Sequence, residues 1–181
     1  MHRRMIAIMS EWRSLFDGAP SRMLAPGETV FAREQPVRSI YMVVTGTVAL
    51  ERPMADGTAL TLYLAREGAL LAEASLFADC YHCDAVARET ARVAMLPKSS
   101  LLAALRAAPD MAIDMFAQAA HEVQRQRSRI EILRLRRVSD RLDAWLELYG
   151  EPSRGEWTRV ADGIGVTPPA LYRELSRRRK E

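Results

Sequence analysis

The segment from Met111 to Val138, MAIDMFAQAAHEVQRQRSRIEILRLRRV, contains neither glycine nor proline and constrains the fold more than any other part of the chain. Its apolar residues recur at alternating intervals of three and four, which places them on one face of a helix. The pattern predicts one long helix with an apolar seam that forms a dimer interface. An amphipathic helix that lies on its own domain is the alternative for the first half. The seam residues are Ile113, Phe116, Ala120, Val123 and Ile130.

The second half of this segment is rich in arginine, and its only acids are Glu122 and Glu131. Such a segment cannot be buried on all sides, so it meets water or a polyanion. The arginines are Arg125, Arg127, Arg129, Arg134, Arg136 and Arg137.

The net charge of +3 is unevenly distributed. Residues 1–121 carry 12 Lys+Arg and 13 Asp+Glu, whereas residues 122–181 carry 14 and 10. The basic excess therefore lies in the last third of the chain. It indicates an anionic partner, of which nucleic acid is the commonest, while a solvated charged surface is the alternative.

Length and composition favour a globular protein. With 181 residues, of which 49% are apolar, the chain can form one ordinary domain and a small second one. No stretch approaches the ~20 apolar residues of a membrane span, and the N-terminus becomes polar too soon for a secretion signal. We expect a cytoplasmic location with no membrane partner, and we interpret Cys80 and Cys83 as reduced thiols.

The first half of the chain predicts a helix followed by strands. Helical spacing runs from Arg4 to Phe16, and then turn signals at Pro26-Gly27, Thr45-Gly46, Asp56-Gly57 and Gly68 separate short runs rich in Val, Tyr, Ile and Leu. Leucines alternate in Thr58–Leu64 after Asp56-Gly57, which favours an antiparallel hairpin with a type I′ turn. The pattern is typical of a small β-barrel or roll.

The strand series is predicted to end with Ala91–Leu96, before Pro97. A short helix through Leu101, Leu102 and Leu105 would follow, capped by Ser99 or Ser100. Pro109-Asp110 would then open the long helix.

The C-terminal part has the pattern of a helix-turn-helix. Val160, Ala161, Ile164 and Val166 form a small apolar cluster around Gly165, where the chain reverses. Thr167 is a suitable N-cap for a second helix, and Pro168 suits its first position. Such a unit places its second helix in the major groove of DNA.

On this second helix Ala170, Leu171 and Leu175 are expected to pack inward. Arg173 is the best candidate for reading a base, because its fork can reach guanine O6 and N7 together. Arg178, Arg179 and Lys180 are candidates for phosphate contacts, with a basic tail as the alternative. The full set of candidate DNA-binding residues is Thr167, Pro168, Pro169, Tyr172, Arg173, Ser176, Arg177, Arg178 and Arg179.

The order of elements and several short sequence motifs resemble those of the transcription regulators typified by the cyclic-AMP receptor protein and FNR. The motifs are Pro26–Phe31, Ile40–Val48, Asp56-Gly57 and Ala72–Phe77. The resemblance implies an α+β fold with a cyclic-nucleotide-binding β-roll of the jelly-roll type, a long dimerisation helix and a C-terminal helix-turn-helix. The expected divisions are residues 1–108, 109–137 and 138–181. A homodimer that binds an inverted repeat in double-stranded DNA would follow.

The chain departs from this family in its DNA-binding part. Many relatives have Arg-Glu after the cap, where this chain has Pro168-Pro169, which can contact bases only by shape. Relatives continue into a β-hairpin wing, whereas this sequence ends at Glu181. We therefore expect a winged helix-turn-helix without a complete wing.

The chain departs from the family at the phosphate-binding cassette too. Ala72 replaces a glycine, Glu73 keeps the ribose-facing acid, His82 replaces an arginine and Cys83 replaces a hydroxyl residue. A largely neutral imidazole lacks the permanently charged fork that holds a cyclic phosphate. Gln126-Arg127 occupies the region where relatives offer Thr or Ser to the base. These differences disfavour a cyclic nucleotide, and the effector remains open.

The segment Cys80-Tyr81-His82-Cys83 has three interpretations. Cys80, His82 and Cys83 are a partial ligand set for a metal or haem, and the thiols could sense redox state. Alternatively, the segment covers the barrel with a hydrogen-bonded His82. Catalytic motifs are absent from the sequence, so no enzyme is predicted. The rival to a regulator is an effector-sensing or interaction module that does not read DNA.

Overall fold

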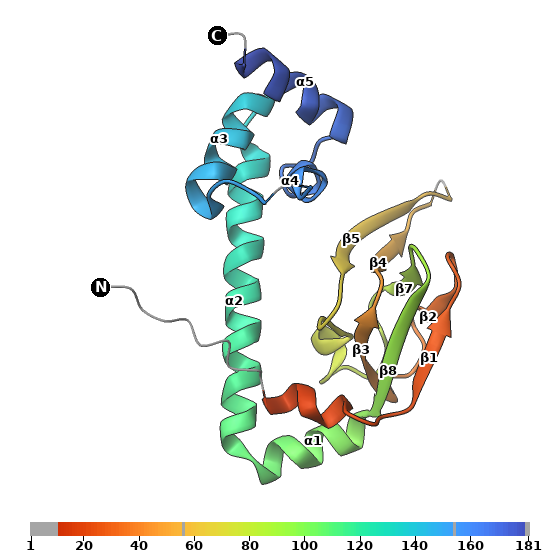
Figure 1. Ribbon diagram of the computed structural model, residues 1–181. Coiled ribbons are helices and arrows are strands. Elements are labelled where there is room, and N and C mark those ends of the chain that lie inside the picture. The colour runs from red at the N-terminus through yellow and green to blue at the C-terminus, as the bar shows by residue number, and fades with distance from the viewer. Residues whose placement is uncertain (1–10, 56, 154, 180–181) are drawn as a thin grey trace. The chain divides into compact units, whose positions relative to one another are not determined.

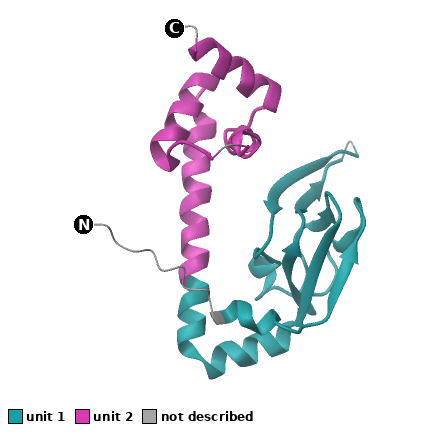
Figure 2. Cartoon of the chain, viewed as in Figure 1, with its two compact units in different colours: residues 1–116 teal, residues 117–181 magenta. Residues whose placement is uncertain are grey.

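The computed structural model describes residues 11–55, 57–153 and 155–179, and divides the chain into two compact units, residues 1–116 and 117–181 (Figure 2). None of the described helices has the length and apolar character that a bilayer span requires.

The first unit is built on two four-stranded antiparallel sheets (Figure 1). Their strand orders are β1-β8-β3-β6 and β2-β7-β4-β5. This arrangement confirms the predicted β-roll. The strands are β1 Ser21–Leu24, β2 Thr29–Phe31, β3 Ser39–Thr45, β4 Val48–Pro53, β5 Ala59–Ala65, β6 Leu70–Leu71, β7 Asp84–Ala87 and β8 Ala91–Pro97.

Inward side chains of both sheets share one apolar core. Ile40 and Val43 of β3, Val48 of β4, Leu71 of β6 and Val93 of β8 are almost completely buried there. Burial of this many aliphatic side chains, at about 1.5–3 kcal/mol each, is the main stabilising contribution to the roll.

Helical segments complete the first unit. The 3₁₀ helix η1 (Glu11–Phe16) places Trp12 and Phe16 in the core, and residues 4–10 of the helix predicted there lie outside the described residues. Helix α1 (Lys98–Ala107) buries Leu101. The predicted cap at Ser99 or Ser100 is wrong, because α1 begins at Lys98 and Pro97 occupies the N-cap position. The Lys98 amide already has a partner, the carbonyl of Arg38.

The β4–β5 connection is antiparallel, as predicted, but it is not a two-residue type I′ turn. Gly57 N donates to Met54 O at 3.1 Å, and Met54 N donates to Thr58 O at 2.8 Å. Three residues therefore separate the closing pair, with Gly57 at φ 83. A three-residue loop with glycine in the left-handed conformation is the next commonest hairpin solution.

Helix α2 (Pro109–Arg134) is the predicted long helix, but it ends at Arg134 rather than continuing to Val138. Its last turn belongs to the core of the second unit, where Ile132 is 2% exposed. The chain must turn after Ile132 so that Leu142 can enter the same core. Arg141 makes this turn favourable, because its Nε donates to the carbonyl of Leu135 at 2.8 Å.

The second unit adds three helices to the end of α2, namely α3 Val138–Tyr149, α4 Trp157–Gly163 and α5 Pro168–Arg178 (Figure 1). Their core consists of Ile132, Leu142, Val160, Ala161, Ile164 and Leu171. Helices α4 and α5 with the turn between them form the predicted helix-turn-helix.

Candidate nucleic-acid interface and effector region

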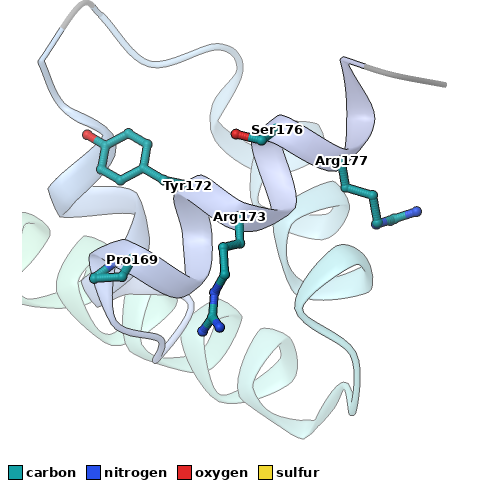
Figure 3. A pocket seen from close by; sticks show the side chains of 5 residues that line it. All are labelled: Pro169, Tyr172, Arg173, Ser176 and Arg177. Atoms are coloured by element: carbon teal, nitrogen blue, oxygen red, sulfur yellow. The ribbon is translucent and has the colours of Figure 1, made fainter.

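Helix α5 has one buried side and one open side. Leu171 is fully buried, and Leu175 packs on the core of the second unit. On the opposite side five residues line an open hollow of about 440 Å³ (Figure 3). Because they recur at intervals of three and four, they form one continuous stripe. We call this surface the α5 stripe, and its residues are Pro169, Tyr172, Arg173, Ser176 and Arg177.

The turn before α5 depends on Gly165, as predicted. Gly165 has φ 68, and a Cβ at this position would lie 2.5 Å from Cδ2 of Leu133. Arg141 Nη1 donates to the carbonyl of Ile164 at 3.2 Å, which anchors the turn on α3. The left-handed conformation favours glycine, and a larger residue would also displace the side chain of Leu133.

Thr167 occupies the N-cap position of α5, but its hydroxyl makes no capping hydrogen bond. The prediction of the position is confirmed and that of the side-chain cap is wrong. With Pro168 and Pro169 in the first turn, few backbone N–H groups remain for the hydroxyl to satisfy. Thr167, Pro168 and Pro169 are all exposed, so the start of α5 is accessible.

Arg173 and Tyr172 are both exposed on the α5 stripe. Tyr172 is 50% exposed. Within the described part of the chain, no side chain pairs with the guanidinium of Arg173, which extends from α5 (Figure 3). An exposed guanidinium without an internal partner can donate to an external acceptor at little cost.

The three arginines at the end of α5 differ in their contacts. Arg177 is exposed and pairs with Glu174 at 2.8 Å. Arg179 is exposed as well. Arg178 is half-buried, and each of its nitrogens has a partner: Nε donates to Glu174, Nη1 to Asp143 and Nη2 to the carbonyl of Ser139.

These contacts affect the titration of the network. Hydrogen bonds from Arg177 and then Arg178 hold the pKa of Glu174 below its usual range. The carboxylate of Asp143 is the largest influence that raises the pKa of Arg178. Sequence reasoning missed Glu174, although its i,i+3 and i,i+4 spacing to Arg177 and Arg178 on one helix is a local signal for ion pairs. It could not reveal Asp143 and Ser139, because they lie on α3 and the patterns do not define how α3 and α5 pack.

In the first unit, the cassette-like segment has an unusual backbone at Ala72. This residue is buried and has φ 72 and ψ 15, in the left-handed region that favours glycine. The 3₁₀ helix η2 (Glu73–Ser75) follows directly, and the side chain of Glu73 is exposed. Position 72 therefore has the backbone conformation of a glycine while carrying a methyl group.

His82 is exposed and bonded to a neighbour in η2. Its Nδ1 lies 2.8 Å from Oγ of Ser75, which is almost fully buried. Sequence reasoning did not single out Ser75, although Ser75 lies within the motif Ala72–Phe77 that carries the family resemblance. The pair corresponds to the interpretation in which His82 is a hydrogen-bonded part of the covering segment.

Cys83 and Tyr81 point into the roll. Cys83 is 1% exposed, and burial is the main cause that raises the pKa of its thiol. The negative charges of Asp84 and Glu73 raise this pKa further. Tyr81 stacks on Phe31 with ring centroids 4.0 Å apart and donates to the carbonyl of Ser39. Burial raises the pKa of Tyr81 to about 12.

Cys80 is exposed, unlike Cys83. Within residues 11–55, 57–153 and 155–179, no group of three or more His, Cys, Asp or Glu side chains could hold a metal ion. Cys80, His82 and Cys83 are therefore not brought together as a ligand set in this region.

Gln126 and Arg127 belong to the second unit. Gln126 Nε2 donates to Glu122 Oε1 at 2.7 Å, and Arg125 pairs with the same carboxylate. Arg127 is exposed.

The predicted seam of α2 is open to solvent. Phe116 is 75% exposed, Val123 48% and Ile130 52%, and Ala120 between them is exposed as well. Exposed apolar side chains that recur along one face of a helix mark an interaction surface.

Comparisons with known proteins agree with the observed fold. Residues 21–108 match the family model of the cyclic nucleotide-binding domain. No curated protein matched the chain.

Three solved structures illustrate the similarity of fold. FixK2 from Bradyrhizobium japonicum is 20% identical, with a TM-score of 0.67, and the match covers 88% of this chain and 83% of that one. CprK complexed with OCPA is 19% identical, with a TM-score of 0.69 and coverage of 94% and 83%. The c-di-GMP responsive global regulator CLP from Xanthomonas campestris is 19% identical, with a TM-score of 0.63 and coverage of 93% and 90%.

Proposed function

We propose that this chain, which has a cyclic nucleotide-binding domain and the fold of the cyclic-AMP receptor protein/FNR regulators, is a homodimeric DNA-binding transcriptional regulator. The observation that carries the proposal is the α5 stripe. It is exposed along the second helix of a helix-turn-helix, and its Arg173 has no pairing partner among the described side chains.

The α5 stripe suits the major groove of DNA. Arg173 lies in its middle, where it would donate two hydrogen bonds to one guanine. Tyr172 and Ser176 flank it and would contact neighbouring base edges. Pro169 would contribute shape and no hydrogen bond, since proline has no N–H.

Phosphate contacts are assigned by accessibility. Arg177 and Arg179 are exposed and can reach the backbone of DNA. Arg178 was a candidate from sequence, but its three internal partners favour a different role. We propose that Arg178 positions α5 on α3 and contributes little to the salt dependence of binding.

The dimer is proposed to form through the seam of α2. A parallel pair of these helices would bury Phe116, Val123 and Ile130 against their equivalents. Two copies of α5 related by a two-fold axis would then enter successive major grooves, and the target would be an inverted repeat.

The effector is proposed not to be a cyclic nucleotide. His82 is already bonded to Ser75, and Cys83 is buried with a neutral thiol. Neither can replace the charged fork and hydroxyl that hold a cyclic phosphate. Titration of cyclic AMP and cyclic GMP by calorimetry is expected to give no sub-micromolar binding.

The DNA proposal is tested by selecting duplexes from a random pool with the purified chain. An inverted repeat should be enriched, and Arg173→Ala should weaken its binding by ~1–3 kcal/mol while discrimination is lost at one base position. Arg106→Ala is the matched control, because Arg106 is an exposed arginine of α1 in the first unit. If selection enriches no inverted repeat, the interaction module that does not read DNA replaces this proposal.

A further inference from the structure

The spacing of the α2 seam places one charged residue among its apolar side chains. Val123 and Ile130 are successive seam residues seven positions apart, and the position between them in the three-four pattern is Arg127. Arg127 is exposed, as are its two apolar neighbours. Arg134 occupies the next such position, but α2 ends there. Arg127 is thus the arginine that lies between two apolar levels of the seam.

The chain offers Arg127 little neutralising charge. Glu122 is engaged by Arg125 and Gln126. Glu131 follows Ile130 and lies beside the seam rather than in it. Across the described residues, Arg127 and Glu131 are not joined by a hydrogen bond or an ion pair, although they are four residues apart on one helix.

A parallel dimer brings the two copies of Arg127 together. The proposed function requires parallel helices, because both copies of α5 must lie at the same end to reach one inverted repeat. In a parallel two-fold pair, each seam residue faces its own equivalent. Two guanidinium groups would therefore meet between the apolar levels of Val123 and Ile130, where repulsion is screened less than in open water.

Resting on the proposed dimer, we propose that the paired Arg127 side chains form a binding site for a small phosphate-bearing anion on the two-fold axis of α2. A phosphate group presents several acceptor oxygens, and each planar guanidinium can donate two parallel hydrogen bonds to it. One anion between two such forks removes their repulsion and satisfies their donors. The site is incomplete in a single chain, so anion binding and dimer formation are linked.

The test measures the dimer dissociation constant of the full chain by sedimentation equilibrium, in chloride with and without pyrophosphate at constant ionic strength. Pyrophosphate should tighten the wild-type dimer by roughly tenfold or more. Arg127→Gln should lose this response. Arg127→Leu should dimerise tightly without pyrophosphate, because it replaces the charged level with an apolar one.

Arg136→Gln is the matched control. It removes one positive charge from an exposed residue just after α2 ends, and it should respond to pyrophosphate as the wild type does. An equal response of wild type and Arg127→Gln overturns the proposal. It is equally overturned if Glu131 neutralises the arginines instead, in which case pyrophosphate leaves the wild-type constant unchanged.

The two proposals fail in different ways. A wild-type dimer that binds an inverted repeat but ignores pyrophosphate overturns the anion site alone. A chain that remains monomeric in every variant and selects no DNA overturns the regulator proposal, and the anion site with it.

Discussion

Arg178 of α5 is joined to Asp143 of α3, with Nη1 donating to Oδ1 at 2.6 Å, although the residues are 35 positions apart. The same guanidinium donates to the carbonyl of Ser139 in the first turn of α3. One side chain thus fixes the end of α5 against the start of α3. Its role is to hold the α5 stripe in place.

Arg178→Ala is expected to loosen α5. Loss of charged hydrogen bonds from a half-buried side chain should cost about 1–2 kcal/mol of local stability. Hydrogen exchange of the α3 and α5 amides measures this as faster exchange. Arg179→Ala is the control, because Arg179 is exposed, and it should change exchange by less than about 0.5 kcal/mol. Equal effects of the two substitutions would contradict the assignment.

Acid should weaken the ion pairs that Glu174 makes with Arg177 and Arg178 within α5. Arg177 and Arg178 lower the pKa of Glu174 in the folded state, so ionised Glu174 stabilises the fold above its unfolded pKa of about 4.3. This contribution is lost as pH falls through the lowered folded pKa. Exchange of the α5 amides should therefore rise below about pH 4.3 more steeply in the wild type than in Glu174→Gln. Parallel pH profiles of the two proteins would refute this prediction.

Gly165→Ala should destabilise the helix-turn-helix in two ways. The left-handed backbone costs an L-residue roughly 1–2 kcal/mol, and Leu133 must turn away from the new methyl group, at roughly 0.5–1.5 kcal/mol. Gly150→Ala is a second glycine variant that lacks the steric part, because no atom lies within 4 Å of a new Cβ there, and its φ 77 and ψ −176 give it a separate backbone cost. Adding Leu133→Ala to Gly165→Ala should remove the cost of displacing Leu133 but not the backbone cost. The free energy of unfolding of the second unit in urea measures this. If adding Leu133→Ala recovers none of the lost stability, the contact with Leu133 is disproved.

The β-roll and the helix-turn-helix could be predicted because their signals are local. Dipeptides such as Pro26-Gly27 and Asp56-Gly57 indicate turns independently of how the strands pair. Gly165 is likewise favoured by the backbone conformation of its own turn. The order of the elements followed from the sequence motifs that resemble the regulator family.

Other features could not be predicted because they depend on distant residues. Helix α2 ends where Ile132 enters the core of the second unit, with no glycine or proline to mark the position. The pairing of His82 with Ser75 and of Arg178 with Asp143 depends on how separate elements pack. A charged residue in the sequence cannot by itself be assigned to DNA or to an internal partner.

The seam of α2 predicts the oligomeric state. Val123→Asp with Ile130→Asp should give monomers in sedimentation velocity, because a carboxylate would be buried at each of two apolar levels. Phe77→Asp is a useful control, since Phe77 is 88% exposed in the first unit and outside the seam. An unchanged dimer in the double variant would locate the interface elsewhere.

The two thiols should differ in reactivity. Cys80 is exposed, whereas Cys83 is buried with a raised pKa, so less of its thiol is ionised at neutral pH. Iodoacetamide should modify native Cys80 much faster than Cys83, as measured by mass spectrometry. After unfolding, the two should react at similar rates. Similar rates in the native protein would show that burial does not protect Cys83.

Arg141 of α3 is bonded to two carbonyls, those of Leu135 after α2 and Ile164 before α5. The connections α2–α3 and α4–α5 therefore share one guanidinium. A displacement of the last turn of α2 would pull on the turn that precedes α5, without passing through the apolar core. A lysine has one nitrogen and could not hold both carbonyls in a fixed relation. The direction in which the α5 stripe faces is thereby tied to the point where α2 ends.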